Sequence, residues 1–147
     1  VAGAALAGRI TTSLGFRQTI MLMTVIMAIG QGSVVFATGV TLFAVLVLIA
    51  QQFLVDAPYT VVDVNAATLR QLSASEEWQG RINATFRVLS FGGSLIGTLL
   101  GGIIGEWLGL RPVLALSALF IALGALWARW IEDPSPALLA AQAPRED

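Results

Sequence analysis

The chain contains no cysteine and no histidine. Without these residues it can form no disulfide, perform no thiolate chemistry and offer none of the usual zinc ligand sets. We therefore expect no metal site, no cofactor and no enzymatic activity. The basic residues are spread along the chain rather than clustered, so nothing indicates binding to nucleic acid.

Charge is also scarce. Of the 147 residues, 12% are charged and 56% are hydrophobic, whereas a soluble domain has roughly 25% charged and 45–50% apolar residues. So little charge cannot cover the surface of a soluble fold. The composition predicts an all-α protein of polytopic transmembrane helices, in contact with the lipid bilayer.

Four apolar segments are long enough to cross a bilayer, since each approaches the ~20 residues that a spanning helix needs. The predicted spans are residues 18–37, 40–62, 85–107 and 112–130. The apolar run at residues 1–8 is too short to span and is interpreted as the tail of a fifth helix, which makes the sequence a C-terminal fragment. We expect a transmembrane region over residues 1–131 and a disordered cytoplasmic tail over residues 132–147.

The polar stretch from Asn65 to Asn83 is expected to be the longest loop between these spans. The other connections are short. Thr38 and Gly39 separate two apolar runs, which predicts a helical hairpin. Pro112 is suited to the first turn of the last helix.

Small residues form a stripe along the third predicted span. Glycine recurs every fourth residue, at Gly93, Gly97, Gly101 and Gly105. Each interior glycine costs a soluble helix about 0.5–1 kcal/mol relative to alanine. In a bilayer the backbone hydrogen bonds stay satisfied, and a small face lets neighbouring helices approach closely. We interpret this face as a helix-packing surface rather than a ligand site.

The second predicted span carries a polar stripe. Gln52, Asp56, Tyr59 and Asp63 are spaced four, three and four residues apart, so they share one helix face. Asp56 lies ~24 Å from the outer start of the span, inside a hydrocarbon core about 30 Å thick. A carboxylate in a membrane costs about 2.5–3.5 kcal/mol on insertion scales and normally faces a cavity or a partner. The stripe is our candidate for a substrate cavity, with Asp56 as a coupling carboxylate.

Alternatives for these residues stay open. Asp56 could instead pair with a helix outside this sequence, or cap backbone groups where Pro58 opens the helix. Asp63 falls near the membrane boundary, where pairing with Arg70 or Arg87 is the favoured interpretation. Gln31, alone in its span, is expected to make a packing contact.

The arginines predict an orientation. With four spans, all of them except Arg111 lie on one side of the membrane. Positive residues mark the cytoplasmic side. We therefore expect both ends of the sequence to be cytoplasmic, in a cell (inner) membrane.

The order of these segments resembles a known family. A basic loop, a hairpin, a polar span, the segment GRINATFR, a glycine-rich span, a tight LGLRP turn and a final span resemble the major facilitator superfamily of transporters, from the end of helix eight through helix twelve. Residues 80–105 are similar to the enterobactin-exporter-like and macrolide-efflux-like branch. The resemblance implies a partial major facilitator fold, in which the polar span lines the cavity and the glycine-rich span packs between halves.

The first polar connection is similar to the superfamily's cytoplasmic loop signature, Gly-x-x-x-Asp-Arg-x-Gly-Arg-Arg. Residues 8–17 are GRITTSLGFR, and the positions assigned to the motif are Gly8, Arg9, Gly15 and Arg17. Thr12 and Ser13 stand where the signature has Asp and Arg. This departure puts in doubt the charge network that latches the inner gate in this half.

The resemblance implies a secondary active transporter that works by alternating access. Its partners would be a small-molecule substrate and the missing N-terminal helices of the same transporter. We expect a proton-coupled exporter of drug-like or siderophore-like compounds. The alternative is a small membrane scaffold that oligomerises through the glycine face and transports nothing.

Overall fold

The computed structural model describes residue 8, residues 10–37, residue 39 and residues 41–135. Arg9, Thr38, Arg145 and the tail from residue 136 onward lie outside these residues. The elements are α2 (Phe16–Ser33), the short 3-10 helix η1 (Val34–Phe36), α3 (Leu42–Ser73), α4 (Glu76–Leu108) and α5 (Leu110–Ala128). The described residues contain no strand, and α2 through α5 are long and apolar enough to cross a membrane. The predicted all-α membrane fold is confirmed.

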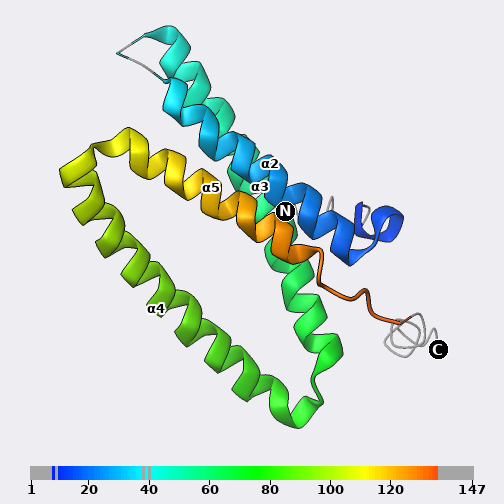
Figure 1. Ribbon diagram of the computed structural model, residues 1–147. Helices are drawn as coiled ribbons and strands as arrows, with labels where there is room; N and C mark the ends of the chain where they lie inside the picture. The colour runs from blue at the N-terminus through cyan, green and yellow to red at the C-terminus, as the bar shows by residue number, and fades with distance from the viewer. Residues whose placement is uncertain (1–7, 9, 38, 40, 136–147) are drawn as a thin grey trace.

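Helices α2, α3 and α5 form a bundle in which α2 contacts both of the others (Figure 1). Met23 of α2 and Val61 of α3 are buried together. On the other side of α2, a Cβ added to Gly124 of α5 would lie 3.9 Å from the Thr24 methyl group. The bundle is therefore organised around α2.

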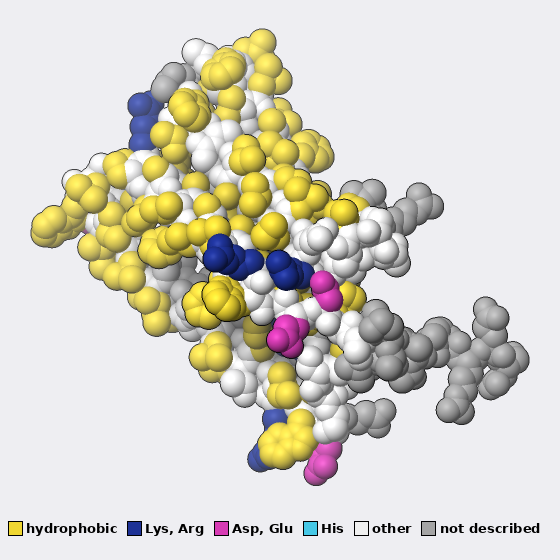
Figure 2. All heavy atoms as spheres, turned by 45° about the vertical axis from the view of Figure 1, so that its right-hand side comes forward, with side chains coloured by type: hydrophobic (Ala, Val, Ile, Leu, Met, Phe, Trp, Pro, Cys, Tyr) yellow, Lys and Arg dark blue, Asp and Glu magenta, His cyan; other side chains and the backbone are white. Residues whose placement is uncertain are grey.

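Most large apolar side chains of the described residues point outward. Figure 2 shows hydrophobic groups over most of the visible surface, with charged groups confined to separate spots. Exposing such a surface to water is unfavourable, whereas lipid tails are as apolar as the side chains themselves. The distribution of side chains supports a membrane environment.

Helix α4 stands apart from this bundle over most of its length (Figure 1). None of its described side chains is buried. It contacts α3 near the α3–α4 connection and α5 near its own C-terminal end. Gly101 and Gly105 lie against Val113 of α5, within 3.8 Å and 3.7 Å of an ideal Cβ. Gly93 and Gly97 have no atom within 4 Å on the same measure, so only half of the glycine stripe is packed in this structure.

The expected loop from Asn65 to Asn83 is wrong. Helix α3 continues to Ser73 and α4 begins at Glu76, so only two residues, Ala74 and Ser75, join the helices. The apolar run ends where side chains leave the hydrocarbon, but the helix has no reason to end there. Alanine, leucine, arginine and glutamine, which follow Asn65, are all good helix formers, and no proline or glycine interrupts them.

The turn between α4 and α5 agrees with the sequence. Gly109 has φ 85°, between the end of α4 and the start of α5. This left-handed conformation suits glycine, which has no Cβ. Pro112 lies in the first turn of α5, where its missing N–H leaves no helical bond unmade.

Candidate functional site

The polar stripe lies on α3, on a face turned away from the bundle. The residues that α3 buries against its neighbours are Ala44, Pro58, Val61 and Asn65. The stripe residues Gln52, Asp56, Tyr59 and Asp63 are all exposed, Tyr59 by 58%. The periodicity that places the four on one face is thus consistent with the burial pattern of the helix.

Within the stripe, the structure brings Gln52 and Asp56 together. The Gln52 Nε2 group donates a hydrogen bond to Asp56 Oδ2, one helical turn away. The Asp56 carboxylate therefore accepts from a side chain rather than capping a backbone group beside Pro58. Tyr59 and Asp63 make no side-chain hydrogen bond within the described part of the chain.

The face of α3 that carries the stripe reaches α4 near the α3–α4 connection. Arg70 follows Asp63 by seven residues, two helical turns, and so occupies the same face of α3. Its guanidinium Cζ lies 4.0 Å from the centroid of the Phe86 ring on α4. Phe86 in turn precedes Gly93 by seven residues and shares its face of α4. The face of α3 that carries the polar stripe thus meets α4 at Arg70 and Phe86, whereas Gly93 and Gly97 of α4 have no atom within 4 Å of an ideal Cβ.

The expected ion pair of Asp63 with Arg70 or Arg87 is not formed. Among the described residues no salt bridge occurs, and Arg70 stacks on Phe86 instead. The Asp63 side chain stays exposed. A carboxylate near the membrane boundary can remain hydrated, so it has little need of a partner.

A chain of hydrogen bonds links the three bundle helices. Gln51 Nε2 of α3 donates to Gln31 Oε1 of α2 over 3.3 Å, and Gln31 Nε2 donates to Ser117 Oγ of α5 over 3.1 Å. The packing contact expected of Gln31 is confirmed. Gln51 was missed as its partner, although its position seven residues after Ala44 and seven before Pro58 places it on the buried face of α3.

The loop-motif residues surround the start of α2. Gly15 is the residue before the helix and has φ 82°, a conformation that favours glycine. The backbone N–H of Arg17 donates to Asp133 Oδ1 over 2.9 Å. A carboxylate at this point satisfies an otherwise free N–H and interacts favourably with the helix dipole. Asp133, which follows α5, is 116 residues away from Arg17 in sequence, so no local pattern could have identified it.

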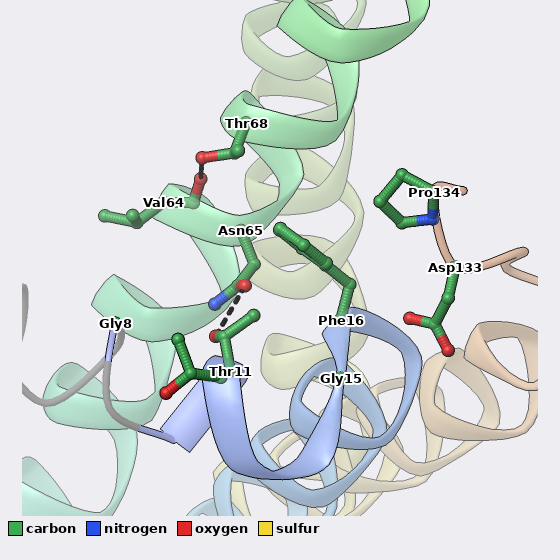
Figure 3. A pocket seen from close by; sticks show the side chains of 10 residues that line it. Gly8, Thr11, Gly15, Phe16, Val64, Asn65, Thr68, Asp133 and Pro134 are labelled. Atoms are coloured by element: carbon green, nitrogen blue, oxygen red, sulfur yellow. Dashed lines mark hydrogen bonds between the residues drawn. The ribbon is translucent and has the colours of Figure 1, made fainter. Parts of the chain in front are cut away.

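A cavity of about 720 Å³ opens where these segments meet (Figure 3). Its lining comes from the segment before α2 and the first residue of α2, from α3 and from the segment after α5, namely Gly8, Thr11, Thr12, Gly15, Phe16, Val64, Asn65, Thr68, Asp133 and Pro134. Thr11 Oγ1 donates to the buried Asn65 Oδ1 over 2.8 Å, and Asn65 Nδ2 donates to the Val61 carbonyl over 2.8 Å. The Asn65 amide is therefore bonded on both sides, and the cavity lies where three segments of the chain meet.

The family of the chain follows from a comparison with known protein families. The family model of the Major Facilitator Superfamily matches residues 1–146. The chain belongs to the major facilitator superfamily. This superfamily consists of multi-pass membrane transporters, which generally are not enzymes. No curated protein and no solved structure matches the chain. The resemblance is confirmed for the superfamily, while its branch and the numbering of the helices stay predictions.

Proposed function

We propose that the chain forms the C-terminal part of a secondary active transporter, from the end of helix eight through helix twelve, and that Asp56 is its coupling carboxylate. The observation that carries this proposal is the position of Gln52 and Asp56. They are bonded to each other on an exposed face of α3, away from the residues that α3 buries against the bundle. Family membership favours this transporter over the scaffold alternative.

The proposed mechanism uses the polar face of α3 and the glycine face of α4. In alternating access, two halves of a transporter rock about a site near the midplane of the membrane. A carboxylate on the cavity face of α3 takes up a proton on one side and releases it on the other. The Gln52 amide orients the Asp56 carboxylate, and the unpacked glycines of α4 allow another helix to approach closely. No covalent step is required.

We further propose that the cargo is a drug-like or siderophore-like compound exported against a proton gradient, and that both ends of the chain are cytoplasmic in a cell (inner) membrane. The arginines support this orientation. Arg17 lies in the first turn of α2, Arg129 follows α5 and Arg70 lies beside the α3–α4 connection, all at one end of the antiparallel helices. At the other end of the helices, Arg111 is the only arginine among the described residues.

The test is Asp56→Asn in the full-length transporter, reconstituted in inside-out vesicles with ethidium as the probe. We expect uptake driven by a pH gradient to fall by about tenfold or more, because the amide cannot carry a proton. Exchange of ethidium without a gradient should persist. The control is Glu106→Gln. Glu106 lies at the C-terminal end of α4, away from the α3–α4 connection, and this variant should behave as wild type. Gradient-driven uptake that survives Asp56→Asn would place the coupling residue elsewhere.

A further inference from the structure

A shallow groove runs along the first turns of α4, close to its connection with α3. Its volume is about 420 Å³, and its lining residues are Trp78, Arg81, Ile82, Thr85, Phe86 and Leu89. The lining is apolar apart from the Arg81 guanidinium and the Thr85 hydroxyl. No element of the structure covers the groove, since every described residue from 77 to 89 except Gln79 is exposed.

Two arginines stack on aromatic rings that line this groove. The Arg81 Cζ atom lies 5.3 Å from the centroid of the Trp78 ring, and the Arg70 Cζ atom lies 4.0 Å from that of Phe86. Neither guanidinium has an acidic partner among the described residues, and the Arg70 Nε atom is buried without a hydrogen-bond acceptor. Both cations are therefore held in place by rings while their charge stays uncompensated.

The polarity of the groove changes along its length in one direction. Trp78 and Arg81 lie at the end near the connection, and tryptophan and arginine are typical of the membrane–water interface. Leu89 lies eight residues beyond Arg81, about 12 Å along the helix axis, where the apolar run of α4 begins. The groove is thus cationic at the level of the headgroups and apolar at the level of the acyl chains.

We propose that this groove binds an anionic phospholipid. The phosphate contacts the guanidinium groups of Arg81 and Arg70, and one acyl chain lies along Ile82, Phe86 and Leu89. Arginine binds phosphate oxygens through two parallel N–H groups, which leaves its planar face free to stack on an aromatic ring. A free phosphate ion would use only the cationic end, whereas a lipid uses the whole length of the groove. The site is independent of proton coupling through Asp56.

The experiment measures phosphatidylglycerol bound to the purified full-length protein in detergent by native mass spectrometry, with phosphatidylcholine for comparison. We expect Arg81→Gln and Arg70→Gln each to weaken phosphatidylglycerol binding about fivefold, the usual effect of one basic residue at an anionic membrane surface. Phosphatidylcholine binding should not change. Arg87→Gln is the matched control, because Arg87 is an exposed arginine that neither lines the groove nor stacks on one of its aromatic rings, as Arg70 does.

Thr85→Glu provides a second variant, since it places a carboxylate in the exposed groove without removing either arginine. It should also weaken phosphatidylglycerol binding. The proposal is overturned if Thr85→Glu binds this lipid like wild type, if Arg87→Gln loses as much binding as Arg81→Gln, or if the two lipids bind equally. Inorganic phosphate that displaces the lipid at equal concentration would also overturn it, in favour of a site for a soluble anion.

Discussion

At the scale of single residues, Gly30 marks the closest approach of α2 and α3. A Cβ added there would lie 2.8 Å from the Leu54 Cβ atom, closer than side chains tolerate. We expect Gly30→Ala to lower the free energy of unfolding by about 1–3 kcal/mol, because the two helices must move apart. Thermal or denaturant unfolding in detergent measures the change.

Gly80→Ala is the control for this prediction. Gly80 lies in α4 with no atom within 4 Å of an ideal Cβ, so alanine should leave stability unchanged or raise it by up to about 1 kcal/mol through its better helix propensity. Equal losses for both variants would show that the α2–α3 crossing has room for a methyl group.

Two neighbouring glutamines of α3 face different surroundings, because successive residues of a helix point in different directions. Gln51 faces the bundle and bonds to Gln31, whereas Gln52 faces outward and bonds to Asp56. The four-residue spacing of Gln52 and Asp56 is enough to place both side chains on one face of a helix. The role of Gln51 depends on α2 being the helix opposite it, and spacing within α3 carries no information about that.

At the scale of elements, the long helices α3 and α4 differ most from expectation. With 32 and 33 residues, each is about 50 Å long, well beyond a hydrocarbon core of roughly 30 Å. Hydropathy reports where side chains meet lipid, and backbone hydrogen bonding decides where a helix ends. The two boundaries coincide in α2 and α5 but not here.

Hydrogen exchange tests the helical connection between α3 and α4. Backbone amides of residues 67–73 and 80–83 should exchange far more slowly than those of an open loop, because each donates to a carbonyl four residues earlier. Residues 133–135, which follow α5 without helical structure, serve as the comparison. Equal exchange in all these segments would favour the loop over the helices.

At the scale of the whole molecule, the antiparallel order of the helices places the start of α2, the α3–α4 connection and the end of α5 at one end. The hydrogen bond from Arg17 to Asp133 joins the start of α2 to the segment after α5, and the bond from Thr11 to Asn65 joins the segment before α2 to α3. Helix α4 is joined to the bundle by the hydrogen bond that Gln79 Nε2 donates to the Gln71 carbonyl of α3, by the Arg70–Phe86 stack and by Val113 against two glycines.

The absence of cysteine allows a direct test of orientation. In inside-out vesicles, a membrane-impermeant maleimide should label Ser75→Cys and Glu132→Cys, whereas Glu106→Cys should react only from the opposite face, because positive residues mark the cytoplasmic side. All three side chains are exposed. Labelling of Glu106→Cys from the cytoplasmic side would contradict the proposed orientation.

Composition and helical periodicity are enough to establish the membrane environment, the all-α class, the four spans and the faces of α3 and α4. These are local properties of the chain. The tertiary structure was needed to show that Gln31 joins three helices through Gln51 and Ser117, that Asp133 caps α2, and that Arg70 stacks on Phe86 rather than pairing with Asp63. Each of these contacts joins residues of different helices or segments. Which helix faces which depends on packing, and packing has no periodic signature in the chain.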